Sequence, residues 1–309
     1  MATVSTDFAA ALTTRYSKIF EDEFLAATRI NDYKRICTVF PSKTLTESFN
    51  WLGTPPQMRL WTDQRVHQAI APMFQYNIQN NHYEATVDVD RDTFEDDQYG
   101  FVETRVAQLA QEAARYPWVL AINALLANPV CYDGQAFFAA THAEGASGTQ
   151  SNILAATGQT VTAMITDLGG AIAQMRGQKD NQGRPMYLGG DGLAVLAPPQ
   201  LEQQFRQIGF NDFIVTQASA GVFGGESNWL KGRFDLIVDP YLPSATTWYL
   251  LDLSAAMKPL IYLDRKPAEF VALTDPGNQQ VFNQRMFSWG ADFRGNVGVA
   301  DWRFALRVA

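Results

Sequence analysis

The sequence predicts an α+β fold, and three observations carry that prediction. Residues 83–91 alternate between apolar and polar side chains, which is the pattern of a strand with one buried face. Beyond Gly100, apolar or small residues recur every three or four positions, which is typical of an amphipathic helix. From Met257 to the end the chain is rich in strand patterns again.

The long helix is expected to follow an acidic cluster at residues 92–97 and to end at Asn128-Pro129. Acidic side chains suit a helix start, where free N–H groups and the helix dipole favour negative charge. Pro117 should kink the helix or start a second one. The whole would be on the order of 40 Å long, enough for the backbone of a flat, elongated subunit.

The chain before this unit contains a helix pattern and a long excursion. The helix pattern covers residues 5–27, which either dock on their own domain or form an arm that reaches a neighbour. Residues 33–82 indicate a long hairpin with irregular material at its tip. Because isolated hairpins are marginal in water and exposed tryptophans invite aggregation, such a loop makes sense if it lies on another subunit.

A turn-rich hinge at residues 129–152 separates a second lobe. Helices are predicted there over 160–175 and 200–208, and strands over 193–197, 213–215, 234–238 and 247–251. In the C-terminal part, strands are predicted over 260–263 and 269–273, which pair with each other, and over 281–293 and 302–308.

Composition excludes some classes of function. The 309-residue chain has a net charge of −8 and no visible Lys/Arg cluster, so it does not resemble a protein that grips DNA phosphates. With 18% charged and 12% aromatic residues, it is either an ordinary soluble globule, which composition alone favours, or a chain that buries surface against neighbours. Two cysteines make no disulfide framework, so a reducing compartment is expected. We expect no signal peptide and no membrane span.

No motif assembles a convincing active site. Cys131 and His142 have the residue types of a nucleophile and its base, but two such residues in a loop are far more often incidental. Residues 88–92 begin like a calcium loop, yet the required glycine and glutamate are replaced by Thr93 and Tyr99. Residues 189–192 lack the lysine of a phosphate loop. We therefore expect no catalytic residue, no cofactor and no metal.

Several motifs nevertheless resemble one known family, the major head subunits of Mu-like phages. The most specific is the Arg-Asp-x-Phe-Glu-Asp-Asp core within residues 87–97. The others are Phe49-Asn50-Trp51-Leu52-Gly53 followed by Trp61, Cys131-Tyr132-Asp133-Gly134-Gln135-Ala136-Phe137-Phe138 followed by His142, and a series that runs from Gly232 to Arg294. The resemblance covers nearly the whole chain in order, and residues 151–230 are the least distinctive part.

The resemblance implies the tailed-phage major capsid fold of the Hong Kong 97 type. Its parts would be an N-terminal arm (1–40), an extended loop (41–83), the strand and spine helix of a peripheral domain (84–145), an axial domain (146–256), the return strands of the peripheral domain (257–295) and a C-terminal strand (296–309).

The resemblance also implies a structural role rather than an enzymatic one. Subunits would self-assemble into pentamers and hexamers of an icosahedral shell in the virion, assembled in the bacterial host cytoplasm and enclosing double-stranded DNA that they contact non-specifically. A separate scaffold protein, a portal and a decoration protein are the implied partners. We expect the inter-subunit contacts to include Trp51, Leu52, Trp61 and Phe74, unless these side chains cover the protein's own core.

Two other functions stay open at this stage. Within the same fold, the chain could form the shell of a cellular nanocompartment of the encapsulin type, which would need an encapsulated enzyme. From another class, a soluble hydrolase would need a clustered catalytic constellation, which the sequence does not show.

Overall fold

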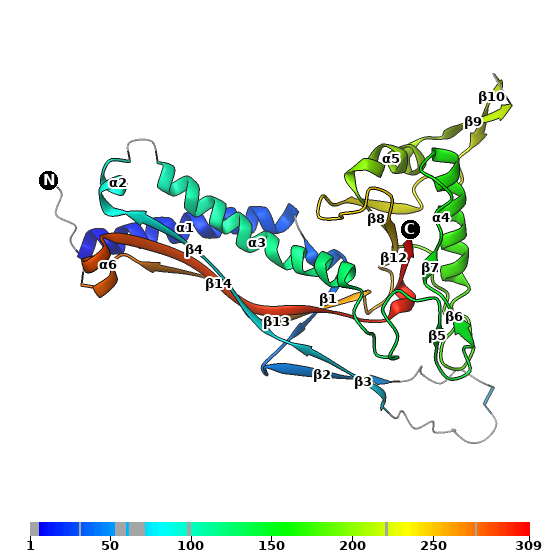
Figure 1. Ribbon diagram of the computed structural model, residues 1–309, viewed down its shortest axis with the longest axis horizontal. Helices are drawn as coiled ribbons and strands as arrows, with labels where there is room; N and C mark the ends of the chain where they lie inside the picture. Colours follow the sequence, from blue (N-terminus) through cyan, green and yellow to red (C-terminus); the bar gives the residue numbers. More distant parts are fainter. Residues whose placement is uncertain are drawn as a thin grey trace.

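The computed structural model describes residues 6–309 except 31, 53–59, 62–71, 98, 99, 220, 221 and 276. An elongated lobe and a second lobe lie side by side, and a two-stranded excursion extends beside them (Figure 1). The helices are α1 (Thr6–Ile30), α2 (Arg91–Glu95), α3 (Phe101–Ala127), α4 (Val161–Arg176), α5 (Glu202–Phe210) and α6 (Gln279–Gln284). The strands are β1 (Cys37–Pro41), β2 (Thr46–Leu52), β3 (Pro72–Gln79), β4 (Asn81–Asp90), β5 (His142–Ala143), β6 (Thr149–Gln150), β7 (Ile153–Leu154), β8 (Leu193–Ala197), β9 (Phe213–Ser219), β10 (Val222–Ser227), β11 (Phe234–Val238), β12 (Trp248–Asp252), β13 (Leu260–Leu273), β14 (Met286–Val299) and β15 (Ala305–Val308).

The elongated lobe is built on a sheet with the strand order β1-β13-β14-β4. β1 runs parallel to β13, whereas β13, β14 and β4 are mutually antiparallel. α1 and α3 cover one face of this sheet, because their apolar stripes meet its apolar side chains. At the centre, the fully buried Trp289 packs edge to face on Tyr16, with 5.2 Å between ring centroids. This contact docks α1 on its own subunit, which was one of the two alternatives for the N-terminal helix.

The second lobe contains a sheet with the strand order β11-β8-β12-β15-β7. α4 and α5 pack against it through Met164, Leu168 and Phe205, and β8 is buried along its whole length. Another part of this sheet shares a core with the C-terminal half of α3, through Trp118 and Ile122. The two lobes are therefore joined by one continuous apolar core.

The excursion is the antiparallel pair β2–β3, which pairs from Thr46 opposite Gln79 to Leu52 opposite Pro72. Its root packs on the elongated lobe: Ile78 is buried, and it lies against Gly298 of β14. The strands then run below β13 in the view of Figure 1, and Phe74 of β3 packs on Tyr132.

Most of the predicted elements are confirmed. The helix expected over 5–27 is α1, the strand expected over 83–91 is β4, and the helix expected over 160–175 is α4. The acidic cluster does start helices, but two of them, because α2 ends at Glu95 before α3 begins at Phe101. The strands predicted for the second lobe appear as β8, β9, β11 and β12.

The predicted pairing between 260–263 and 269–273 is wrong. These segments are the two ends of a single strand, β13, and both pair with β14. The polar stretch between them does not break the strand, because register shifts between Asp264 and Lys266 and between Lys266 and Glu269 absorb it as bulges.

The strands predicted over 281–293 and 302–308 are wrong at their N-terminal ends. Residues 279–284 form α6, and Arg285, with a left-handed φ of 54°, separates this helix from β14. Residues 302–304 form a 3₁₀ turn, because the Asp301 carboxylate accepts a hydrogen bond from the Arg303 N–H at 3.0 Å. β14 also runs to Val299, beyond the end of the predicted strand at residue 293.

Pro117 does not start a second helix. It lies inside the continuous α3, where the ring removes one backbone hydrogen bond. Pro117, Trp118 and Val119 are all buried, so packing against both lobes holds this part of the helix in place.

We predict that Gly295→Ala destabilises the elongated lobe. A Cβ atom there would lie 2.5 Å from the backbone oxygen of Leu263, so the strands β13 and β14 would have to shift. The expected cost is about 1–3 kcal/mol in the free energy of unfolding, measured by urea titration of tryptophan fluorescence. Gly190→Ala is the control, because a Cβ there meets nothing within 4 Å. An equal effect of both substitutions would contradict the prediction.

Candidate functional site

The excursion is the first candidate site, because most of the predicted contact residues lie on it. The backbone of Trp51 pairs with that of Phe74. The side chains of Trp51 and Leu52 lie outside the described part of the chain. Near the tip, Leu60 is 86% exposed and Trp61 is 64% exposed. The tip therefore presents large apolar side chains to its surroundings.

The side chain of Phe74 is less exposed than those of Leu60 and Trp61. It is half-buried, and its ring centroid lies 5.7 Å from that of Tyr132 in the same chain. Part of its surface therefore covers the protein's own core, which was the alternative considered for these residues. The sequence pattern could not separate Phe74 from Trp61, because both are aromatic residues in the same predicted hairpin.

A carboxylate orders the turn at the root of the excursion. Glu47 Oε1 accepts hydrogen bonds from Ser42 Oγ at 2.7 Å, Thr44 Oγ1 at 2.9 Å, and the backbone N–H groups of Lys43 at 3.1 Å and Thr44 at 3.2 Å. The Ser42 and Thr44 hydrogen bonds, followed by the Lys43 one, lower the pKa of Glu47 to about 2. Asn80 Nδ2 completes the turn by donating to Ser42 Oγ at 2.7 Å.

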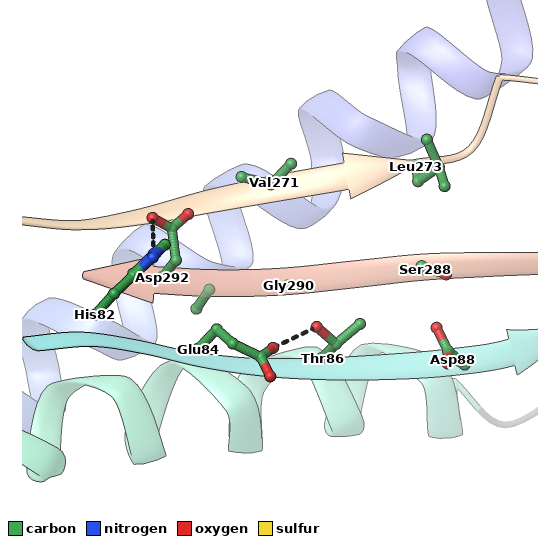
Figure 2. Close-up of a pocket in the computed structure, with 10 residues that line it drawn as sticks. His82, Glu84, Thr86, Asp88, Val271, Leu273, Ser288, Gly290 and Asp292 are labelled. Atoms are coloured by element: carbon green, nitrogen blue, oxygen red, sulfur yellow. Dashed lines mark hydrogen bonds and ion pairs between the residues drawn. The ribbon is translucent and has the colours of Figure 1, made fainter. Parts of the chain in front are cut away.

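The second candidate site is the sheet face opposite α1 and α3, here called the outer sheet face (Figure 2). It forms an open hollow of about 470 Å³, lined by His82, Glu84, Thr86, Asp88, Val271, Leu273, Ser288, Gly290, Ala291 and Asp292. His82 Nε2 lies 3.2 Å from an Asp292 carboxylate oxygen, and Lys266 Nζ lies 3.1 Å from the same atom. Thr86 Oγ1 donates to Glu84 at 3.0 Å. The surface is acidic, and among the described residues no cluster of His, Cys, Asp or Glu is arranged to hold a metal ion.

The acidic cluster that resembled the start of a calcium loop serves the helix starts. Asp90 Oδ1 accepts hydrogen bonds from the N–H groups of Asp92 at 2.9 Å and Thr93 at 3.3 Å. Asp97 accepts from the N–H groups of Phe101 at 3.1 Å and Val102 at 3.0 Å, at the beginning of α3. These carboxylates thus satisfy backbone donors that the helices leave free.

A buried ionic network ties the hinge region to the C-terminal segment. Arg303 forms ion pairs with Asp301 at 2.7 Å and with Glu144 at 3.1 Å, and it donates to Tyr132 Oη at 2.8 Å. Burial raises the pKa of Glu144, and the Arg303 charge opposes that rise. Sequence reasoning missed this network, because its members lie up to 171 residues apart.

The two residues considered as a catalytic pair are both structural. His142 Nδ1 lies 2.6 Å from an Asp133 carboxylate oxygen, and the histidine ring stacks on Trp302 at 3.9 Å, with no exposed surface. Cys131 Sγ donates to the carbonyl oxygen of Ala300 at 3.3 Å. Burial raises the pKa of Cys131 and likewise that of the fully buried Cys37, so neither thiol is a nucleophile.

This architecture is the major capsid fold of tailed phages. The fold is similar to that of the procapsid of bacteriophage JBD30, with a TM-score of 0.59 and 24% identity over 98% of this chain and 75% of that one. It is also similar to the mature capsid of bacteriophage PhiM1, with a TM-score of 0.57 and 11% identity over 89% of this chain and 85% of that one. At such identities these likenesses show the fold.

The family follows from the sequence match. The model of the Mu-like prophage major head subunit gpT matches residues 9–168 and 243–309, so the chain belongs to that family. It is 28% identical to the Mu-like prophage FluMu major head subunit of Haemophilus influenzae, over all of this chain and 75% of that protein. It is 27% identical to the major capsid protein of Escherichia phage Mu, over 96% of this chain and 72% of that protein.

The family membership establishes the broad function. The chain is a structural subunit of a multimeric phage head shell in the virion, and not an enzyme. The nanocompartment and hydrolase alternatives are therefore not favoured. Among the described residues, no helix has the length and apolar character needed to cross a bilayer.

We predict that Arg303→Met strongly destabilises the subunit. The substitution leaves Asp301 and Glu144 buried without their cation, which should cost about 3–5 kcal/mol in the free energy of unfolding. Urea titration measures this cost. Arg206→Met is the control, because the ion pair of Arg206 with Glu202 is exposed and should contribute less than about 1 kcal/mol. Equal effects of the two substitutions would refute the role of the network.

We predict that the turn at the root of the excursion loosens only in strong acid. The folded-state pKa of Glu47 lies below that of the unfolded chain, so the carboxylate stabilises the turn above about pH 4.5 and loses this effect as pH falls towards 2. Pepsin cleavage between residues 42 and 47, followed by mass spectrometry from pH 5 to pH 2, should rise steeply over that range. Glu47→Gln should be cleaved readily at pH 5 already. Similar cleavage of both forms at pH 5 would rule out this role.

Proposed function

We propose that copies of this chain form pentamers and hexamers that close into an icosahedral shell around double-stranded DNA, with the excursion lying over a neighbouring subunit. The observation that carries this proposal is the exposed tip of β2–β3. Leu60 is 86% exposed and Trp61 is 64% exposed, in the segment that links β2 to β3. Large apolar side chains that are exposed on one subunit gain burial when subunits assemble.

Magnitudes support the same conclusion. Burying a large apolar side chain contributes about 1.5–3 kcal/mol, so the tip of each excursion supplies a few kcal/mol when it docks. Contacts of that size are weak singly, but each subunit of a closed shell makes many of them. Trp51, Leu52 and Trp61 are the proposed inter-subunit anchors. Phe74 would contribute only the part of its surface that its own core leaves open.

The parts of the fold receive proposed roles. We assign the elongated lobe to the peripheral domain, with α3 as its spine helix, and the second lobe to the axial domain. Residues 1–40 remain the proposed arm, although α1 packs on its own sheet in the subunit described here.

The proposed partners are a separate scaffold protein, a portal and a decoration protein, and the proposed place of assembly is the host cytoplasm. The shell would enclose DNA without binding it tightly. The net charge of −8 and the acidic outer sheet face support this, because tight binding of phosphates requires clustered lysine and arginine.

The test is assembly of the purified chain, observed by negative-stain electron microscopy and light scattering, alone and with its scaffold protein. Rings of five and six subunits, or closed shells, are the expected result. A chain that stays monomeric in both conditions would overturn the proposal.

We predict that Trp61→Ala weakens assembly without unfolding the subunit. Removing an anchor of this kind should cost about 2 kcal/mol per contact, which is roughly a thirty-fold rise in the protein concentration needed for assembly. Light scattering gives that concentration, and circular dichroism checks the fold. Leu45→Ala is the control, since Leu45 is similarly exposed but lies at the root of the excursion. Unchanged assembly of Trp61→Ala would remove Trp61 from the proposed anchors.

A further inference from the structure

A small pocket lies between the C-terminal end of α3 and the sheet of the second lobe. Its volume is about 160 Å³, and it is lined by Leu126, Leu242, Pro243, Ser244, Thr247, Tyr249, Arg307 and Ala309. A protein cavity of about 150 Å³ holds a molecule the size of benzene, so this pocket has room for a ligand of about six non-hydrogen atoms. We call it the Arg307 pocket.

The strand pairing places three hydrogen-bond donors in the Arg307 pocket. Arg307 of β15 lies directly opposite Tyr249 of β12 in the antiparallel ladder. Their side chains therefore leave the sheet on the same face, within reach of one ligand. Thr247 precedes Tyr249 by two residues and lines the same pocket. A guanidinium group and two hydroxyl groups thus face one enclosed space.

The charge of Arg307 has no counter-ion within the described part of the chain. Its Nε atom is buried and has no hydrogen-bond partner. Among the described residues its guanidinium forms no ion pair, and this includes the carboxyl group of Ala309, which also lines the pocket. The guanidinium carbon lies 5.6 Å from the centre of the Phe138 ring, which helps to hold the group in place. A partly buried cation without a counter-ion is costly, so the arrangement indicates an anion that comes from outside the subunit.

The two hydroxyl groups are also available to an external acceptor. Tyr249 is only 4% exposed, yet its Oη makes no hydrogen bond with the residues that the structure describes. Burial raises the pKa of Tyr249, and the Arg307 charge opposes that rise, so the hydroxyl keeps its proton at neutral pH. Thr247 Oγ1 accepts a hydrogen bond from Ser244 Oγ at 2.9 Å, which leaves its own proton for another acceptor.

The lining identifies the class of anion. A guanidinium group pairs with a planar carboxylate through two parallel hydrogen bonds, and the hydroxyl groups can donate to the same oxygens. The remaining walls are apolar, at Leu126, Leu242 and Pro243. Such walls suit a hydrocarbon stem, whereas a free phosphate would leave them without a partner.

We propose that the Arg307 pocket binds a carboxylate on a short apolar stem, supplied either by a free short-chain acid or by a glutamate side chain. Arg307 would pair with the carboxylate, Tyr249 and Thr247 would donate to it, and the apolar walls would cover the stem. This site is independent of the proposed function, because all its described parts lie within one subunit.

The first test is isothermal titration calorimetry of the full chain with butyrate and with the α-amide of N-acetylglutamic acid. Saturable binding of at least one of them is expected, and the tighter of the two identifies the source of the carboxylate. Butyramide, which has the same shape without the charge, should bind at least about ten-fold more weakly than butyrate. No saturable binding of either acid, equal binding of butyramide, or tighter binding of inorganic phosphate would overturn the proposal.

The second test separates binding from folding. Tyr249→Phe removes an Oη that makes no hydrogen bond in the described structure, so it should leave the thermal unfolding midpoint unchanged. It should still weaken binding of the preferred acid by roughly ten-fold, the loss expected for a hydrogen bond to a charged group. Arg307→Gln should weaken it by at least about a hundred-fold.

The matched control is Arg206→Gln, which removes an exposed arginine of the same lobe outside the pocket. Its affinity for the acid should equal that of the wild type. Unchanged binding in both Tyr249→Phe and Arg307→Gln, or an equal loss in Arg206→Gln, would overturn the assignment of the site.

Discussion

The antiparallel pairing of β13 with β14 is the interaction on which the rest of the subunit depends. Both strands run over fourteen residues, and α1 and α3 pack on the apolar side chains of one face of this strand pair. The root of the excursion rests on the same pair, at Gly298. Just beyond β14, the chain turns at Asp301 and enters the sheet of the second lobe as β15. One strand pair thus sets the positions of the helices, the excursion and the second lobe.

The subunit exposes apolar side chains that gain burial when it assembles with other copies. The excursion leaves Leu60 and Trp61 in solvent, and the second lobe leaves Phe210, Phe213 and Trp229 in solvent. Each group is small, so a contact made through it alone would be weak. The core beneath them is the opposite case. It is joined across the lobes by α3 and by the Arg303 network, so the subunit itself is well fixed before it meets a neighbour.

Local patterns in the sequence predicted the elements that depend on local forces. The alternation of β4 and the apolar stripes of α1 and α3 are each set by one buried face, and they were predicted correctly. Prediction failed where distant residues decide the outcome. The polar middle of β13 resembles a break between two strands, because its bulged pairing with β14 cannot be read from the sequence. The sequence around Arg303 likewise gives no indication that Glu144 and Tyr132 are its partners. The head-subunit function was predicted from motif resemblance. The residues of the proposed contacts between copies could not be derived from the pattern, because half of each proposed contact lies on another copy.

The placement of the two cysteines has a consequence for the durability of the particle. Cys37 and Cys131 are both buried, and burial raises the pKa of each thiol, so neither is ready to form a bond with a neighbouring subunit. A head can therefore pass from reducing to oxidising surroundings without any change in its covalent chemistry through these thiols. Cohesion between copies of this chain is then expected to come from packing and polar contacts and not from disulfides through Cys37 or Cys131.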